Sequence, residues 1–171
     1  CIEAAGPVDV LVNNAGIGFL NALEGTPMDT ARLLFETNTL GTMAMTQAVL
    51  PGMRARRSGS IVNVTSSVTE VPLHLLSVYT ASKAAVNAFS HSVALELQPF
   101  GIKVRVVLPG RAPETDFGQN ARALMTAGIP EAYGDIAEAV FARWAEQPVD
   151  EVTHAADVAA AAERDRHVQD H

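Results

Sequence analysis

The chain has 171 residues, 48 % hydrophobic and 5 % aromatic, a length that favours one domain with a substantial core. Its formal net charge of −7 argues against nucleic acid or an anionic membrane as a partner. Cys1 is the single cysteine, so an internal disulfide is excluded. No signal-peptide pattern and no apolar run of membrane-spanning length is visible, and the five histidines lack metal-ligand spacing, so we expect a cytoplasmic protein without a metal site.

Three apolar runs predict β-strands. Residues 8–12 form a nearly continuous apolar run, as expected of a parallel strand that is covered on both faces. Residues 61–65 alternate in polarity like a strand, and residues 103–108 predict a third one. Strands that are separated by helical patterns indicate the α/β class.

Two long helical patterns lie between these strands. The first runs over residues 26–53, and Gly41 and Pro51 are its expected bends. The second begins near Tyr79 and ends at about Gln98, just before a proline and a glycine. Further helices are predicted around Ile136 to Trp144 and from Thr153 onward.

Tyr79 and Lys83 lie four residues apart at the start of the second long helix. This spacing places both side chains on one helix face, one turn apart. An ammonium beside a phenol favours the phenolate, so we expect Lys83 to lower the pKa of Tyr79 into a range useful for proton exchange. Ser66 follows the second predicted strand, at the edge where open α/β sheets bind ligands.

Each of these features also has an ordinary structural explanation when it stands alone. A serine after a strand is usually a helix cap or a turn residue. The run Asn13-Asn14-Ala15-Gly16 fits a turn, and Asn38 on an apolar helix face fits a buried structural amide. What favours a shared site is the occurrence of all of them, in order, within about a hundred residues.

Together these residues resemble the short-chain dehydrogenase/reductase family in order and spacing. The residues that carry the resemblance are Asn13-Asn14-Ala15-Gly16, Asn38, Ser66, Tyr79, Lys83 and Pro109-Gly110. The resemblance implies a three-layer, Rossmann-like, doubly wound parallel sheet, with four parallel strands in this chain and helices on both faces. It also implies an NAD- or NADP-dependent oxidoreductase that transfers a hydride between nicotinamide and a carbonyl or secondary alcohol.

The same resemblance assigns the catalytic roles. Tyr79 exchanges the proton, and Ser66 hydrogen-bonds the substrate oxygen. Lys83 binds the nicotinamide ribose and tunes Tyr79, while Asn38 completes a water relay to solvent. The implied partners are a small carbonyl or alcohol substrate and further copies of the chain, in a homodimer or homotetramer built through the two long helices.

The implied cofactor contacts extend over the strand ends. They are Asn14, Ala15 and Gly16 on the adenosine-ribose side, Tyr79 and Lys83 at the nicotinamide ribose, and Pro109 and Gly110 against the nicotinamide. Many relatives carry a carboxamide-binding threonine five positions after the proline. Here that position is Glu114, so the role is assigned to Thr115, one position late. Residues 73–76 predict an apolar wall over the substrate.

The family's glycine-rich cofactor turn, Thr-Gly-x-x-x-Gly-x-Gly, has no counterpart before Val8. Residues 1–5 read as the last turn of a helix, so we expect the chain to begin in mid-protein. On this hypothesis residues 1–171 form a single partial Rossmann-like domain whose N-terminal strands are missing, and the isolated chain is inactive. The alternative hypothesis is a non-catalytic truncated remnant, or a dimerising partner of a full-length paralogue.

Overall fold

The computed structural model describes residues 6–112, 115–124, 128–146, 156–158 and 160. The predicted helix tail at residues 1–5, the residues at which the helix from Thr153 would begin, and Glu114 lie outside the described residues. Among the described helices, none is both long enough and apolar enough to cross a membrane.

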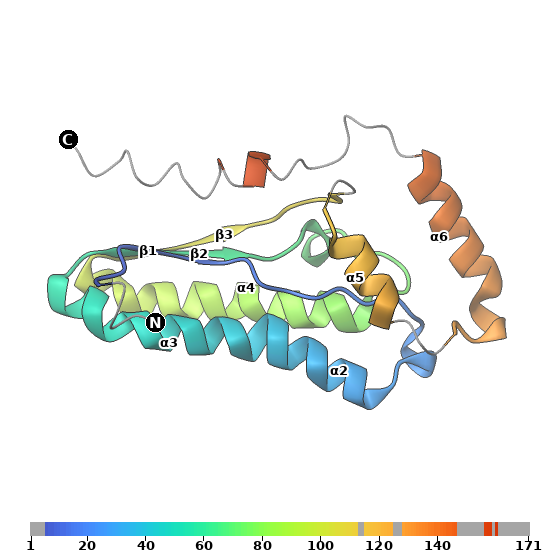
Figure 1. The fold of residues 1–171 in the computed structure, drawn as a ribbon, viewed down its shortest axis with the longest axis horizontal. Helices are drawn as coiled ribbons and strands as arrows, with labels where there is room; N and C mark the ends of the chain where they lie inside the picture. Colours follow the sequence, from blue (N-terminus) through green and yellow to red (C-terminus); the bar gives the residue numbers. More distant parts are fainter. Residues whose placement is uncertain (1–5, 113–114, 125–127, 147–155, 159, 161–171) are drawn as a thin grey trace.

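A parallel sheet forms the centre of the fold (Figure 1). Its strands are β1 (Val10–Asn13), β2 (Gly59–Val64) and β3 (Ile102–Val107), in the order β1-β2-β3. In the register, Ile61 of β2 faces Leu11 of β1 and Val104 of β3. The α/β class and the incomplete parallel sheet are therefore confirmed. The expected fourth strand is not found among the described residues, which fold only the three apolar runs into strands.

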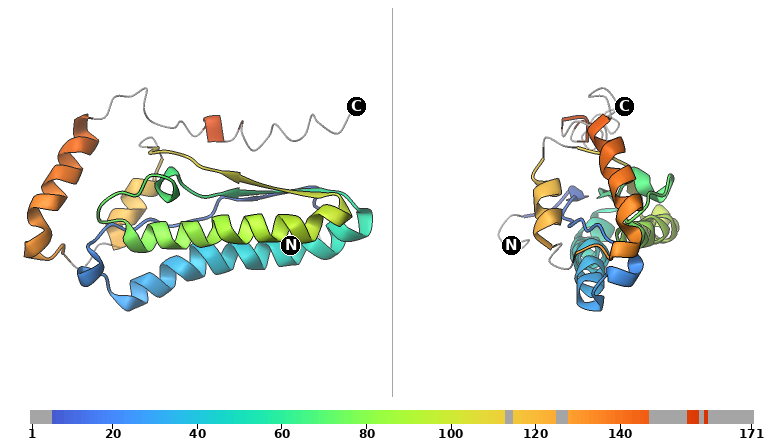
Figure 2. Two further views of the ribbon diagram at one scale, coloured as in Figure 1. Left: turned by 180° about the vertical axis from the view of Figure 1, so that it is seen from behind. Right: turned by 90° about the vertical axis from the view of Figure 1, so that its right-hand side faces the viewer.

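Two helical columns cover one face of this sheet (Figures 1 and 2). The first consists of α2 (Met28–Phe35), a π-helical segment η2 (Glu36–Leu40) and α3 (Gly41–Arg56). The second is α4 (Ser77–Leu97), which ends in a 3-10 turn, η4 (Gln98–Phe100), and in Gly101 at a φ of +69°. Helix α3 packs on β1 and β2, and α4 packs on β3. The helical layer that was expected on the second face is not found among the described residues.

The remaining elements are short and gather toward the carboxyl ends of the strands. They are three 3-10 turns, η1 (Leu23–Gly25), η3 (Ser67–Thr69) and η5 (Glu131–Tyr133), and two helices, α5 (Phe117–Leu124) and α6 (Gly134–Glu146). In Figure 1, α5 stands over the start of α4, and α6 stands farther out on the same side.

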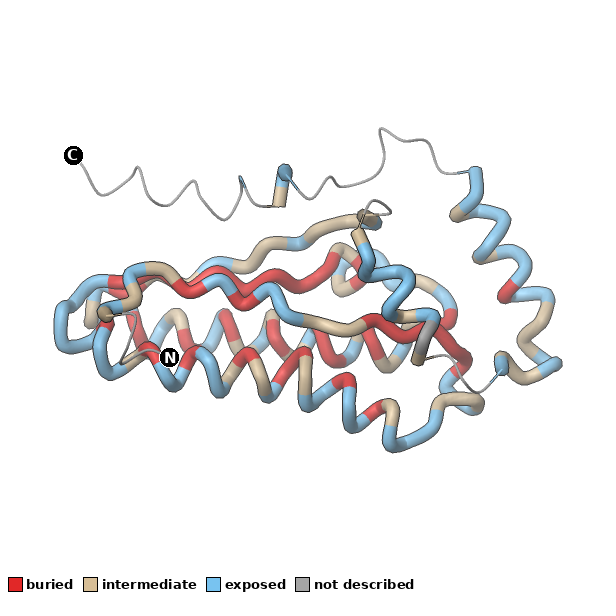
Figure 3. Tube along the Cα trace, in the orientation of Figure 1, coloured by how far each residue is buried: buried red, intermediate tan, exposed pale blue. Residues whose placement is uncertain are grey.

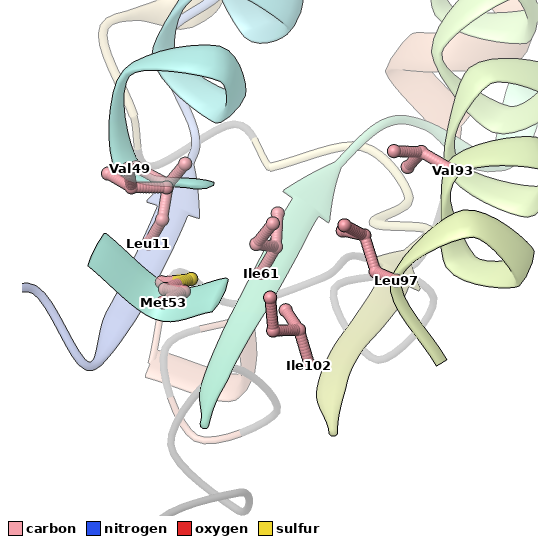
Figure 4. Close-up of a cluster of buried hydrophobic side chains, with 7 residues drawn as sticks. All are labelled: Leu11, Val49, Met53, Ile61, Val93, Leu97 and Ile102. Atoms are coloured by element: carbon pink, nitrogen blue, oxygen red, sulfur yellow. The ribbon is translucent and has the colours of Figure 1, made fainter. Parts of the chain in front are cut away.

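The main core lies between the sheet and the helices α3 and α4 (Figure 4). Its buried members are Leu11, Val49, Met53, Ile61, Val93, Leu97 and Ile102. Strand β2 is buried along its whole length (Figure 3), although its sequence includes the polar residues Ser60 and Asn63. Each such buried aliphatic side chain stabilises the fold by about 1.5–3 kcal/mol. Gly59 is required here, because a Cβ at this position would lie 2.5 Å from the Met53 sulfur.

Candidate active site

Four predicted catalytic residues, Asn38, Ser66, Tyr79 and Lys83, lie near the carboxyl ends of β1 and β2. All four are at least nine-tenths buried. Two relations connect them: the Ser66 hydroxyl is close enough to the phenol of Tyr79 to lower its pKa, while Asn38 and Lys83 both border the position that a Cβ on Gly16 would occupy. The strand ends thus gather side chains that are far apart in the sequence.

Lys83 points from α4 toward the end of β2. Its Nζ donates a hydrogen bond to the carbonyl oxygen of Val64 at 3.0 Å, and the residue is only 5 % exposed. Burial disfavours the charged ammonium and lowers the pKa of Lys83 to about 8. Lys83 therefore loses its proton more readily than an exposed lysine, within a physiologically relevant range of pH.

Tyr79 lies one turn before Lys83 and is 7 % exposed. Burial raises the pKa of the Tyr79 phenol above its ordinary value of 10.0, and the hydrogen bond with Ser66 opposes this by favouring the phenolate. The expected lowering of this pKa by Lys83 is not found, because desolvation is the dominant cause and Ser66 is the group that opposes it.

Asn38 belongs to η2, the π-helical break between α2 and α3. Its Oδ1 accepts from the Ile17 N–H at 2.8 Å, and its Nδ2 donates to the Ile17 carbonyl at 3.0 Å and to Ser82 Oγ at 3.0 Å. The amide therefore clamps the loop after β1 to helix α4. These contacts match the structural explanation of Asn38, and its role in a water relay stays a prediction.

The segment after β1 also borders the side chains of Asn38 and Lys83. Asn14 and Ala15 are exposed and Gly16 is half-buried. A Cβ on Gly16 would lie 3.1 Å from Lys83 Nζ and 3.2 Å from Asn38 Oδ1. A side chain there would therefore crowd the two polar groups, which accounts for the glycine in the Asn-Asn-Ala-Gly run.

The exit turn of β3 is tied to the Ser66 loop. Ser67 N–H donates to the Pro109 carbonyl at 2.9 Å, and both Pro109 and Gly110 are half-buried. Thr115 behaves differently, since its hydroxyl donates to the carbonyl of Ala112 at 2.8 Å. The Thr115 hydroxyl thus closes a local turn, and its assignment to a cofactor contact stays a prediction.

Sequence reasoning missed several buried polar partners of this site. Ser82 Oγ donates to the Tyr79 carbonyl at 2.7 Å while accepting from Asn38. Below the site, Asn63 accepts from Asn13 Nδ2 at 2.8 Å and donates to Ser90 Oγ at 2.8 Å. The available signal was a polar residue at a position whose periodicity indicates burial, because buried polar groups require partners.

A second missed residue is Phe117, at the start of α5. Its ring centroid lies 6.0 Å from that of Tyr79, with the planes inclined by 57°. No sequence pattern pairs these two rings, because the rest of α4, strand β3 and the segment after β3 separate them in the chain. Within the described part of the chain, no group of three histidine, cysteine or acidic side chains is placed to hold a metal ion.

A parallel α/β sheet with these polar side chains at its carboxyl edge is the arrangement in which open sheets bind ligands. Residues 1–126 match the family model described as short chain dehydrogenase. This match covers well over half of the chain. The chain therefore belongs to the short-chain dehydrogenase family.

Individual relatives agree with this family. A 3-ketodihydrosphingosine reductase from Bacteroides thetaiotaomicron is 40 % identical over 134 residues, which are 78 % of this chain and 49 % of the relative. A short-chain dehydrogenase structure from Streptomyces avermitilis has a TM-score of 0.80 at 36 % identity and covers 98 % of this chain and 59 % of its own. NAD⁺-bound xylitol dehydrogenase has a TM-score of 0.62 at 30 % identity, covering 64 % of this chain and 43 % of its own. The chain thus spans about half the length of these proteins.

Proposed function

We propose that this chain supplies the catalytic part of an NAD- or NADP-dependent oxidoreductase that acts on a small carbonyl compound or secondary alcohol. The observation that carries the proposal is the convergence of two contacts at one sheet edge, Ser66 with Tyr79, and Asn38 with Lys83 around Gly16. Membership of the short-chain dehydrogenase family and the NAD⁺ bound to a similar structure support it.

The residues present fit a nicotinamide dinucleotide. The glycine at position 16 leaves open the space beside Lys83 Nζ, where a Cβ would otherwise stand. The Lys83 ammonium has three N–H groups and donates one to Val64, which leaves donors for ribose hydroxyls. The exposed residues Asn14 and Ala15 follow β1, and the half-buried turn at Pro109 and Gly110 follows β3, at the same edge of the sheet.

In the proposed reaction the bound nicotinamide supplies or accepts the hydride. During reduction, the Tyr79 hydroxyl donates its proton to the carbonyl oxygen as negative charge develops there. The Ser66 hydroxyl holds that oxygen beside the phenol and favours the phenolate that results, while the Lys83 ammonium donates to the nicotinamide ribose. Oxidation of an alcohol runs the same steps in reverse.

We also propose that residues 1–171 form one partial Rossmann-like domain that assembles as a homodimer or homotetramer. Support for assembly comes from exposed apolar side chains on the column of α2, η2 and α3, namely Leu33, Leu40 and Met45. Large apolar side chains exposed on a helix are candidates for an association face.

The test uses the natural full-length protein and compares the two tyrosines of this chain, Tyr79 and Tyr133. Tyr79→Phe removes only the phenolic oxygen, so we expect turnover to fall by at least about a hundredfold while nucleotide affinity stays within about twofold. Tyr133→Phe is the matched control, because the Tyr133 hydroxyl bonds Glu24 on the surface. Substantial turnover in Tyr79→Phe would refute the assignment. Nucleotide binding without turnover of any carbonyl by the unaltered protein would favour the non-catalytic alternative.

A further inference from the structure

Helix α5 brings an aromatic ring onto the reactive phenol. Phe117 opens this helix, and its ring lies against that of Tyr79 at a centroid distance of 6.0 Å. Figure 1 shows α5 standing across the carboxyl ends of the strands, over the start of α4. Phe117 is 39 % exposed, so this residue is partly accessible to solvent.

Gly18 leaves space for the Phe117 ring. A Cβ on Gly18 would lie 2.8 Å from Phe117 Cε1 and Cζ, and 3.2 Å from the Cβ of Ala121, one helical turn later. Real Cβ atoms do not come this close to a ring, so any larger residue at position 18 must displace the Phe117 ring or helix α5. Gly18 therefore seats the aromatic ring at its position beside Tyr79.

The surroundings of the phenol ring are apolar as well. Tyr79 packs in a buried cluster with Phe19, Leu34 and Val68. Leu73 and Leu124 pack against the edge of this cluster, and Leu124 is the last residue of α5. Both ends of α5 thus contribute apolar surface around Tyr79, and the Ser66 hydroxyl supplies the polar contact to the phenol.

We propose that Phe117, seated by Gly18, is a specificity-determining residue that selects substrates with an alkyl or aryl group beside the reacting carbon. This inference rests on the proposed function. The substrate oxygen lies at Ser66 and Tyr79, and its apolar substituent lies against the Phe117 ring. A carboxylate or hydroxyl in that position loses water without gaining a partner, which disfavours charged and polyhydroxylated compounds. An aromatic substituent adds a ring contact to the gain from burial.

The test measures reduction of acetophenone and hydroxyacetone by the natural full-length protein with NADH or NADPH. In Phe117→Ala we expect the ratio of kcat/KM for acetophenone over hydroxyacetone to fall by about tenfold or more, chiefly through a higher KM for acetophenone. Gly18→Ala should lower the same ratio, because its new Cβ displaces the ring. Phe141→Ala is the matched control, since Phe141 is a half-exposed phenylalanine on α6 that contacts Trp144. It should leave the ratio within about twofold.

Circular dichroism establishes that each variant is folded. If Phe117→Ala does not fold, Phe117→Leu replaces it, with an expected fall of about threefold because the aromatic contact alone is lost. Acetophenone binding is measured separately by calorimetry. Turnover with an unchanged ratio in the folded Phe117 variant overturns this inference and leaves the proposed function standing. If acetophenone binding weakens in Phe117→Ala but no ketone is turned over, the proposed function is overturned and an apolar contact with Phe117 is supported. If the protein shows neither acetophenone binding nor turnover, both the proposed function and this inference are overturned.

Discussion

The buried junction around Asn38 and the outer helices α5 and α6 are built in opposite ways. At the junction, Asn38, Ser82 and Lys83 are at most 5 % exposed, and each is tied by a side-chain hydrogen bond to another element or to its own helix. In the outer helices most residues are exposed or half-buried, and Ala137 is the buried residue of α6. We call these regions the junction and the cover.

This difference separates two requirements of the proposed enzyme. Proton exchange demands fixed positions for the phenol and the ammonium, and buried hydrogen bonds between distant segments supply them. Substrate choice demands a surface that adapts, and partly exposed helices with few buried contacts open at low cost. The predictions below test whether the two regions really differ in this way.

The largest effect is expected from Asn38→Leu. The substitution leaves the N–H and the carbonyl of Ile17 without their partner and removes a donor from Ser82 Oγ. Unsatisfied buried groups of this kind should lower the free energy of unfolding by about 3–4 kcal/mol, measured by urea denaturation. Asn120→Leu, on the exposed face of α5, should change it by less than about 0.5 kcal/mol. Equal costs at the two positions would remove the distinction between junction and cover.

Asn63→Ala should have the next largest effect. Asn63 is fully buried and joins Asn13 of β1 to Ser90 of α4. Removal of the Asn63 amide leaves Asn13 and Ser90 each without this hydrogen-bond partner and creates a small cavity. We therefore expect the free energy of unfolding to fall by about 2–3 kcal/mol. In a double-mutant cycle with Ser90→Ala, a coupling energy near zero would contradict the proposed network.

The buried lysine makes the stability of the junction depend on pH. Below pH 8 Lys83 is charged in both states, and its burial opposes folding. Between about 8 and 10.5 the folded state releases this proton while the unfolded state keeps it, so the free energy of unfolding rises with pH. The raised pKa of Tyr79 acts in the opposite direction, but only above its ordinary value of 10.0.

Denaturation at pH 7.5 and at pH 9.5 isolates this contribution. The natural protein should gain about 2 kcal/mol relative to Lys83→Met over that interval. A parallel pH dependence in the two proteins would show that Lys83 titrates as an exposed lysine does.

Local sequence patterns predicted the frame of this molecule but not its long-range contacts. The three strands, the Tyr79 helix and the position of Ser66 follow from apolar runs and spacing, because the side chains of one element repeat at fixed intervals. The π-helical break at Asn38 and its bonds to Ile17 and Ser82 depend on three segments meeting in space.

The electrostatics of the site were hidden for a related reason. The direction of the pKa of Tyr79 depends on the depth of burial, and a four-residue spacing contains no measure of depth. The seat of Phe117 against Gly18 likewise joins two positions that no local pattern relates. The fourth strand and the second helical layer were expected from the family's arrangement, and the described residues do not contain them.

The smallest effect is expected in the cover, and Trp144 reports it directly because it is the only tryptophan in the chain. The Arg111 guanidinium lies 5.9 Å from the centroid of the Trp144 ring and also donates to the Trp144 carbonyl, which attaches α6 to the exit turn of β3. Arg111 is exposed, so Arg111→Gln should destabilise this attachment by only about 0.5–1 kcal/mol.

In urea, the fluorescence midpoint should therefore fall in Arg111→Gln while the far-ultraviolet circular dichroism midpoint stays unchanged, because the junction does not depend on this contact. Arg122→Gln, an exposed arginine on α5, should move neither midpoint. If fluorescence and circular dichroism instead shift together in Arg111→Gln, the cover and the junction unfold as one cooperative unit. Substrate choice would then be as rigidly determined as the positions of Tyr79 and Lys83.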